Sequence, residues 1–389
     1  MPNHKQCINI DDLRLHAKKR LPKSVFEFID GGAQDEITLG NNNKDFRNFR
    51  FIPRVLTDIS HRNQEVELFG QRYSTPLILG PVGLAGLVRR EGENHAAMAA
   101  ANQNVPFCPS SMSTCSIEEI TQKTSARQWF QLYVLRDRGI TREFIRRAKE
   151  THCSVLVVTV DTKLLGARER DIRNGFVVPP KFTLSTLFDF LIHTRWLFDV
   201  GLGRKIKYRN FDNTSVNANS VMSITEFIKE QWDVSINWDD IAWFKEQWGG
   251  TVVIKGILSH KDARIAESIG ADGVIVSNHG GRQLDGAISS ISALAKIKAS
   301  VSEDYPLILD GGIRRGSDVV KAIALGAKAC MLGRPWLYGL ASGGQDGVER
   351  CIEILKAEID LTLGLLGVTQ LNDLNPSYLS RTSDFDALG

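Results

Sequence analysis

Eight short apolar runs, separated by segments with helical amphipathicity, follow one another between residues 76 and 332 of this chain. Each run is short enough for a strand buried on both faces, and segments such as Arg142–Thr151 and Lys261–Ile269 read as amphipathic helices. Strands that alternate with helices predict an α/β fold, a (β/α)8 TIM barrel. A doubly wound open sheet is the alternative, but no G-x-G-x-x-G motif follows the first run. The runs are Pro76–Gly80, Val105–Pro109, Trp129–Val134, Val155–Val160, Thr251–Ile254, Gly273–Val276, Leu307–Leu309 and Ala329–Leu332.

The rest of the chain is arranged around this barrel, and we predict one domain. Residues 1–75 form an N-terminal helical cap, residues 76–366 the barrel, and residues 367–389 a C-terminal tail. In the cap, Asp11 and Asp12 are candidate helix N-caps, and Gly31-Gly32 is expected to end a helix. The fourth and fifth strands lie roughly 90 residues apart, where a simple βα unit needs far fewer. We therefore expect an insertion at about residues 181–235, on the face where the βα loops open.

Composition excludes several classes of protein. The net charge of +3 is too small to suggest nucleic-acid binding. The six cysteines contain no C-x-x-C pair, which favours reduced thiols and no metal site. The N-terminal residues lack the apolar core of a signal peptide, and the best apolar window, Thr75–Val88, is too short to span a membrane. These features predict a cytoplasmic protein with a large core.

Polar residues stand at or just past the ends of the predicted strands, where a barrel places its active site. The stretch from Ser277 to Asp285, SNHGGRQLD, joins an imidazole, His279, to a guanidinium, Arg282. One can accept a proton and the other can hold a carboxylate through two hydrogen bonds, which suggests chemistry on a small carboxylic acid. A glycine-rich turn with an incidental histidine is the alternative. Other strand ends carry Gly80, Pro81, Val82, Gly83, Ser110, Ser111, Met112, Gln131, Tyr133, Thr159, Asp161, with Arg168 beyond, and Lys255.

The last two strand ends are typical of a phosphate site. The seventh run is followed by Asp310-Gly311-Gly312-Ile313-Arg314-Arg315, and the eighth by Gly333-Arg334. Glycines let backbone N–H groups approach an anion, and Arg315 and Arg334 can neutralise it. Nucleotides, flavins and sugar phosphates all remain possible ligands at this point.

These motifs resemble, in order, those of the FMN-dependent L-2-hydroxy acid dehydrogenases and oxidases, from about Leu21 to about Gly367. The resemblance implies FMN as cofactor, a homotetramer, and His279 as base, oriented by Asp161. It implies that Arg168 and Arg282 hold the substrate carboxylate and that Tyr133 bonds its hydroxyl. Residues implied to contact FMN are Gly80, Pro81, Val82, Gly83, Ser110, Gln131, Thr159, Lys255, Ser277, Asp310, Gly311, Gly312, Arg314, Arg315, Gly333 and Arg334.

Three residues depart from the pattern of the family or of many of its members. Phe28 stands where the family has a tyrosine that contacts the substrate carboxylate, so one donor is missing. Met112 replaces a tryptophan of glycolate oxidase-like members, and a flexible methionine predicts a wider pocket. Gly83 replaces a common alanine, as in the mandelate dehydrogenase branch. Phe28 and Met112 are therefore candidate substrate-binding residues.

The predicted insertion combines bases with apolar side chains. Between Lys181 and Arg209 lie six Lys or Arg residues and two Asp residues, a net charge of +4. Interleaved aromatic and leucine residues suit a membrane interface, although an active-site lid packed on the barrel is the alternative. The segment resembles the membrane-anchoring segment of mandelate dehydrogenase, which implies peripheral binding at the cytoplasmic face of the membrane through residues 181–211.

We therefore expect an enzyme that oxidises an (S)-2-hydroxy acid, similar to lactate or mandelate, and passes electrons to a membrane quinone. A soluble oxidase that reduces oxygen to hydrogen peroxide is the first alternative. A non-redox FMN barrel of the type 2 isopentenyl diphosphate isomerase kind, and an inactive binding protein, are two further alternatives. His279, Arg282 and Arg168 together argue against the isomerase, whereas Phe28 is compatible with an inactive protein.

Overall fold

The computed structural model describes residues 4–175, 183–203, 205–212 and 230–381. Its centre is a parallel sheet in which seven strands follow the order β4-β10-β9-β8-β7-β6-β5. Seven of the eight predicted runs form these strands, so the strand pattern in the sequence is confirmed. The strands are β4 (Leu77–Leu79), β5 (Trp129–Tyr133), β6 (Val155–Thr159), β7 (Thr251–Ile257), β8 (Gly273–Val276), β9 (Leu307–Asp310) and β10 (Ala329–Leu332).

The remaining predicted run lies between the two edges of this sheet. Leu79 N donates to Pro106 O at 2.9 Å, and Gln131 N donates to Pro109 O at 2.9 Å. Single parallel bridges join Leu79 to Phe107 and Ser110 to Gln131. Pro106 and Pro109 have no N–H group to donate, which explains why this segment pairs without forming a regular strand. The segment closes the barrel between β4 and β5.

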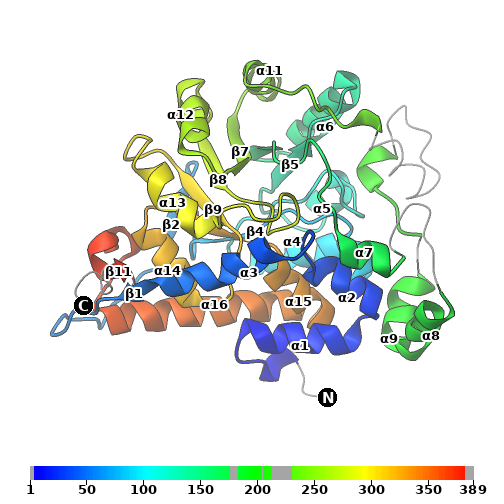
Figure 1. Ribbon diagram of the computed structural model, residues 1–389, viewed down its shortest axis with the longest axis horizontal. Coiled ribbons are helices and arrows are strands. Elements are labelled where there is room, and N and C mark those ends of the chain that lie inside the picture. The colour runs from blue at the N-terminus through cyan, green and yellow to red at the C-terminus, as the bar shows by residue number, and fades with distance from the viewer. Residues whose placement is uncertain (1–3, 176–182, 204, 213–229, 382–389) are drawn as a thin grey trace.

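Helices follow most strands and cover the outside of the barrel (Figure 1). Side chains from alternate strand positions, including Val157, Val253 and Ile308, fill its interior. A hairpin, β2 (Val66–Leu68) and β3 (Gln71–Tyr73), packs against this interior cluster through Leu68 and Tyr73. The helices are α4 (Gly92–Asn102), α5 (Ile117–Thr121), α6 (Arg138–Glu150), α11 (Asp239–Trp248), α12 (His260–Ser268), α13 (Ser290–Lys298), α14 (Gly316–Ala324), α15 (Arg334–Gly343) and α16 (Gln345–Leu366).

The N-terminal residues form the expected helical cap, with α1 (Ile10–Arg20), α2 (Lys23–Asp30) and α3 (Ile37–Lys44). Gly31 follows α2 directly, as predicted. The N-cap prediction was wrong: Asn9 caps α1 by accepting from Asp12 N at 2.8 Å, while Asp11 and Asp12 lie in the first turn. The short strand β1 (Phe49–Phe51) pairs antiparallel with β11 (Leu379–Arg381), which joins the cap to the C-terminal segment.

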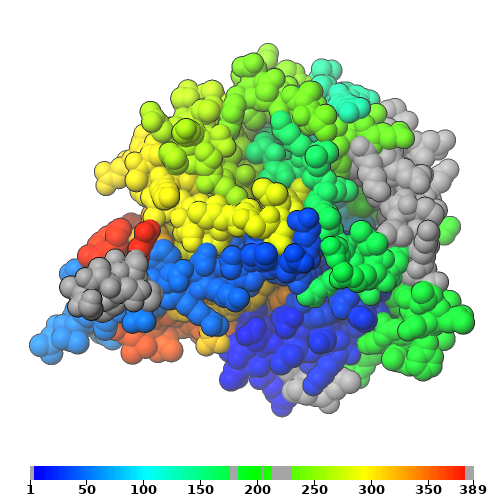
Figure 2. Space-filling view, in the orientation of Figure 1, coloured from blue at the N-terminus to red at the C-terminus, as the bar shows by residue number. Residues whose placement is uncertain are grey.

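The insertion after β6 contains α7 (Glu169–Arg173), α8 (Leu184–Ile192), α9 (Thr194–Trp196), η4 (Leu197–Gly201) and η5 (Arg209–Phe211). The segment 183–203 projects beside the N-terminal cap (Figure 2). Lys181, Phe182 and Arg204, which belong to the basic and aromatic pattern, lie outside the described residues. Within the described residues, no helix is long and apolar enough to cross a membrane.

Candidate active site

Alternation along the strands brings the predicted polar residues to one end of the barrel. In β7, Val253 fills the interior, and Lys255 is two positions further on. Successive side chains of a strand point to opposite faces, so residues two positions apart share a face. By this spacing Gln131 and Tyr133 lie on the same face of β5 as the interior residue Trp129, and Thr159 lies on the same face of β6 as Val157. A cavity of about 1190 Å³ opens at this end, and it is lined by Tyr133, Lys255, His279, Arg168 and Arg282, among others.

His279 sits on a loop with an unusual backbone. It has φ +58°, and Gly280 and Gly281 continue in the left-handed region at +65° and +73°. A non-glycine residue in this region is uncommon and requires support from its surroundings. Here Asn278 and Asn42 exchange side-chain hydrogen bonds of 2.7 and 2.8 Å, and Asn278 also accepts from Gly281 N at 3.1 Å. The cap helix α3 therefore holds the His279 loop in place.

Asp161 and His279 form a buried pair. His279 Nδ1 lies 3.0 Å from Asp161 Oδ1, which leaves Nε2 directed at the cavity. Gly256 makes room for this contact, because a Cβ there would stand 2.6 Å from Asp161 Cβ. Burial lowers the pKa of His279 below its usual value, although the Asp161 charge opposes that shift. Burial raises the pKa of Asp161, but His279, Lys255 and a backbone hydrogen bond together outweigh it, and the net shift is downward. A neutral imidazole beside an ionised carboxylate is suited to accept a proton.

Tyr133 completes this side of the cavity. Its hydroxyl lies 3.4 Å from His279 Nε2, and its ring packs on Trp232 with centroids 5.3 Å apart. Burial, reinforced by the Asp161 charge, raises the pKa of Tyr133 to about 12. The phenol therefore stays protonated and can donate a hydrogen bond to an oxygen that gains negative charge.

A buried cation stands at the base of the cavity. Lys255 Nζ lies 2.8 Å from Asp310 Oδ2 and 3.0 Å from Ser277 Oγ, and Ser277 Oγ donates to Asp310 Oδ2 at 2.6 Å. Burial lowers the pKa of Lys255, but Asp310 and Asp161 outweigh it and raise the pKa overall. Lys255 thus remains charged beside any ligand bound in the cavity.

Arg168, Arg282 and Arg334 also line the cavity. Arg282 Nη1 donates to Phe28 O at 2.8 Å and to Gly31 O at 2.9 Å. Arg334 donates to Gly31 O at 2.7 Å and to Gly280 O at 2.9 Å. Carbonyls at the C-terminal end of α2 thus hold two guanidinium groups, in keeping with the negative end of the helix dipole. Burial, together with Arg168 and Arg334, lowers the pKa of Arg282.

Arg168 is the arginine with an open position. Its Nε is buried and has no hydrogen-bond partner among the described residues, and the side chain lines the cavity beside Arg282. An anion bound by Arg168 and Arg282 would relieve the mutual repulsion of the two cations. The geometry therefore fits a carboxylate.

Among the residues predicted to contact FMN, Gly80, Ser110, Gln131, Thr159 and Ser277 do not themselves line the cavity. Ser110 Oγ donates to Gln131 Oε1 at 2.7 Å, and Gln131 Nε2 donates to Thr159 Oγ1 at 2.8 Å, so three of these side chains form one buried chain. Gly80 packs closely against Met331: a Cβ at residue 80 would stand 2.5 Å from Met331 Cγ, so a larger side chain would clash there. The cavity itself is lined by Pro81, Val82, Gly83, Met112, Asp310, Gly311, Gly312, Arg314, Gly333 and Arg334.

Arg315 differs from the sequence prediction. Its guanidinium pairs with Glu358 at 3.1 Å and does not line the cavity, whereas Arg314 does. The glycine-rich turns, Arg314 and Arg334 still leave an anion cradle, and Lys255 lies at the base of the same cavity. This combination fits the phosphate and the polar ring edge of FMN.

Several cavity residues were missed by sequence reasoning. Trp196, Val200, the run from Lys205 to Tyr208, and Trp232 all come from the insertion. Asp171 on α7 also lines the cavity, and burial raises the pKa of this carboxyl while Arg282 and Arg168 oppose the shift. No motif marks these positions. The length of the insertion was the available signal, since βα loops surround a barrel site.

Comparison with known proteins gives a consistent result. Residues 17–381 match the FMN-dependent dehydrogenase family. The chain is 43% identical to an L-lactate dehydrogenase of Alcaligenes faecalis, over 95% of this chain and 98% of that protein. It is 40% identical to an (S)-mandelate dehydrogenase of Pseudomonas putida, over 95% and 93%.

Solved structures agree with these relatives. The crystal structure of the monotopic membrane protein (S)-mandelate dehydrogenase superposes with a TM-score of 0.93 at 39% identity, covering 97% of this chain and all 100% of that one. A mandelate oxidase bound to (S)-mandelic acid superposes with a TM-score of 0.82 at 35% identity, covering 96% and 98%. The chain therefore belongs to the FMN-dependent dehydrogenase family, and its cofactor is FMN.

Proposed function

We propose that this protein oxidises an (S)-2-hydroxy acid to the corresponding 2-oxo acid. One observation carries the proposal: His279, which pairs with Asp161, lines the same cavity as Arg168, Arg282 and the anion cradle. A base and a carboxylate site next to a flavin are what such an oxidation requires. The relatives named above, L-lactate and (S)-mandelate dehydrogenases, support the same class of substrate.

The residues divide the work as follows. Arg168 and Arg282 bind the carboxylate and so fix the orientation of the substrate. Oxidation of an alcohol to a ketone removes two protons and two electrons, so a base is needed; His279 Nε2 accepts a proton, and Asp161 stabilises the resulting imidazolium. Tyr133 Oη, 3.4 Å from that nitrogen, hydrogen-bonds the substrate oxygen. FMN, when bound, supplies the two-electron acceptor.

Phe28 shapes the remainder of the substrate pocket. It lines the cavity, and its ring lies beneath the Arg282 guanidinium, whose carbon is 5.4 Å from the ring centroid. Its backbone carbonyl binds Arg282, so the residue still supports the carboxylate site even though the ring offers no hydroxyl. We infer a carboxylate site with one donor fewer and an apolar wall in its place.

We propose a membrane quinone as the electron acceptor and the cytoplasmic face of the membrane as the location. We define the insertion surface as the exposed apolar side chains of the segment 183–203. These are Leu184, Leu187, Phe188, Leu191, Ile192, Phe198 and Leu202, and each is between 46% and 87% exposed. A surface of this kind, next to a segment that lines the flavin cavity, supports peripheral membrane association.

Anaerobic mixing with a panel of 2-hydroxy acids tests the reaction. An (S)-acid such as L-lactate or (S)-mandelate should bleach the FMN absorbance, while its (R)-enantiomer should not. The absence of bleaching by every acid in the panel would contradict the proposal. Readmission of oxygen then separates the acceptors: slow reoxidation without peroxide supports a quinone, and rapid peroxide formation supports an oxidase. We also propose that the protein forms a homotetramer. Light scattering, which measures the mass of the assembly in solution, tests this.

A further inference from the structure

Asn210, in the short helix η5 of the insertion, is almost fully buried. It forms hydrogen bonds with the loop that follows Val105–Pro109, the segment between β4 and β5. The side chain is 1% exposed. Its Nδ2 donates to Ser110 O at 3.3 Å and to Ser111 O at 3.2 Å, and its Oδ1 accepts from Ile117 N at 3.0 Å. One amide therefore ties three backbone groups of residues 110–117 together, across about a hundred residues of sequence.

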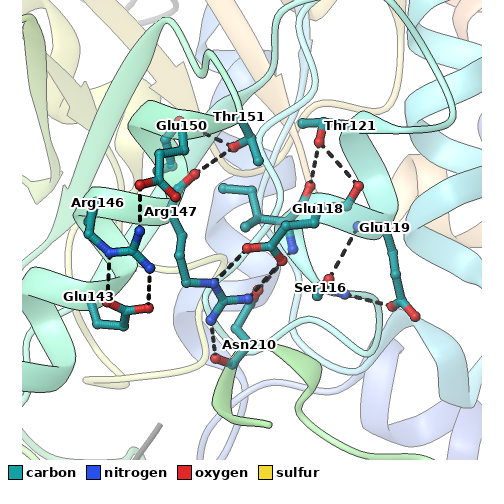
Figure 3. A network of polar contacts seen from close by, with 12 residues as sticks. Ser116, Glu118, Glu119, Thr121, Glu143, Arg146, Arg147, Glu150, Thr151 and Asn210 are labelled. Carbon is teal, nitrogen blue, oxygen red and sulfur yellow. Dashed lines mark hydrogen bonds and ion pairs between the residues drawn. The ribbon is translucent and has the colours of Figure 1, made fainter. Parts of the chain in front are cut away.

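A second buried group fixes Asn210 itself. Arg147 on α6 donates from Nη1 to Asn210 O at 2.6 Å, and it holds Glu118 of α5 with two hydrogen bonds of 2.6 and 2.8 Å. Figure 3 shows Arg147 reaching between Glu118 and Asn210. Arg147 is 4% exposed. A buried guanidinium that makes three hydrogen bonds is costly to disturb, so η5 is held firmly to α5 and α6.

The loop held by Asn210 belongs to the cofactor cavity. Ser110 starts the hydrogen-bonded chain that continues to Gln131 and Thr159, and Ser111 Oγ accepts from Tyr133 N at 3.2 Å. Met112 lines the cavity, and its carbonyl accepts from Leu84 N at 3.1 Å. A displacement of this loop would move the groups beneath the flavin and the tyrosine beside His279 at the same time.

We propose that Asn210 is a positioning residue, which sets the place of the Ser110–Met112 loop against FMN and so makes the end of the insertion part of the active site. It acts through the loop and touches neither substrate nor the reacting atoms. The insertion then has two parts: an outer part with the insertion surface, and an inner part from Lys205 to Phe211 that forms the cavity wall and holds the loop.

The test compares Asn210→Asp with Asp212→Asn, both as FMN-loaded protein. Asn210→Asp keeps the size of the side chain and the acceptor for Ile117, but it turns two donors into an anion facing two carbonyls. Asp212 is the next exposed position and contacts Arg209 at 3.4 Å. Two readouts need no substrate: the visible FMN spectrum and the FMN midpoint potential. A third, which rests on the proposed function, separates the limiting rate of anaerobic FMN reduction from the dissociation constant of the hydroxy acid.

In Asn210→Asp we expect a shifted spectrum and potential and a limiting rate lower by about 10- to 100-fold, since small misplacements near reacting groups have effects of this size. The substrate dissociation constant should stay close to that of the wild type, because Arg168 and Arg282 are untouched. Asp212→Asn should match the wild type in every readout. A loaded Asn210→Asp protein with wild-type spectrum, potential and limiting rate would overturn the proposal. The proposal would also be overturned if the limiting rate fell only in proportion to the fraction of protein that had lost FMN.

Glu118→Gln keeps the test decisive if Asn210→Asp does not fold. The neutral amide retains one bond to Arg147 and loosens its hold on Asn210, so smaller shifts in spectrum and potential are expected. Lower thermal stability with an unchanged FMN spectrum would mean that the network is structural only, against the proposal. If the wild type itself is reduced by no hydroxy acid, the proposed function fails, whereas the spectrum and potential still decide the role of Asn210.

Discussion

At the scale of single residues, the site depends on how burial and charge are balanced around His279. Burial alone favours the neutral imidazole, while the Asp161 carboxylate 3.0 Å away favours the imidazolium. The net shift of the His279 pKa is downward, which favours the neutral imidazole. In the proposed reaction, this imidazole is the base and the Asp161 carboxylate stabilises its conjugate acid.

Asp161→Asn should separate these two contributions. Removal of the anion that raises the pKa of His279 should move the acid limb of kcat/KM to lower pH. The limiting rate at neutral pH should fall by about 10²–10⁴-fold, since the imidazolium loses its partner. Stopped-flow reduction of FMN across pH 5 to 8 measures both effects. An acid limb that moves to higher pH would show that Asp161 does not act on His279 in this way.

Two adjacent arginines offer a matched pair for the phosphate site. Arg314 lines the cavity, whereas Arg315 pairs with Glu358 outside it. Arg314→Gln should weaken FMN binding by about tenfold or more, because a hydrogen bond to a charged group contributes about 1.5–3 kcal/mol. Arg315→Gln should leave FMN affinity near that of the wild type. Fluorescence titration of the apoprotein with FMN measures both, and the opposite order would place the phosphate elsewhere.

Phe28→Tyr tests the missing donor. If the new hydroxyl reaches the carboxylate, the dissociation constant of a small acid such as L-lactate should fall by about tenfold, from the same range of hydrogen-bond energies. The methyl ester of the acid serves as a control, since it carries no anion and should gain much less. Equal gains for acid and ester, or none for either, would mean that residue 28 does not face the carboxylate.

At the scale of elements, the insertion has one part with exposed apolar side chains and another part that lines the cavity. Helix α8 has no buried residue, while Trp196, which follows it, is 8% exposed and donates from Nε1 to Leu87 O at 2.7 Å. The exposed apolar positions of α8 can therefore be changed without touching the cavity wall. This makes α8 the suitable element for a test of membrane binding.

Leu191→Ser and Leu361→Ser form the matched pair for that test, since both leucines are 61% exposed, one in α8 and the other in α16. Leu191→Ser should lower the affinity for anionic vesicles by about tenfold, because burial of a leucine side chain contributes about 1.5–3 kcal/mol. Leu361→Ser should bind like the wild type, and FMN reduction should be unchanged in both. Vesicle sedimentation measures the difference. Equal binding by both variants would remove α8 from the membrane contact.

Element positions were predictable from the sequence, whereas several site details were not. The buried strands read as apolar runs because both of their faces are covered, and alternation then placed Lys255 and Thr159 inside the barrel. Which of the two arginines, Arg314 or Arg315, lines the cavity depends on the direction of a single turn, and composition does not encode that direction. Asn210 carries no motif, and its partners lie about a hundred residues away, so its contacts appear only in the folded chain.

At the scale of the whole molecule, the cap, the barrel and the insertion each contribute a wall of one cavity. The cap supplies the α2 carbonyls that hold Arg282 and Arg334, and the barrel supplies Lys255 and His279. The insertion supplies the run from Lys205 to Tyr208. Residues of the site thus come from three regions, which explains why the resemblance to the family extends along nearly the entire chain.

The proposed mechanism depends on His279 as the base in an FMN-dependent oxidation of a 2-hydroxy acid. Anaerobic stopped-flow reduction of the wild type and of His279→Gln, both loaded with FMN, measures its role. We expect the variant to keep FMN and still bind the acid, while its limiting rate of FMN reduction falls by about 10²–10⁴-fold and loses its dependence on pH below neutrality. If the loaded variant is reduced at the wild-type rate, His279 is not the base.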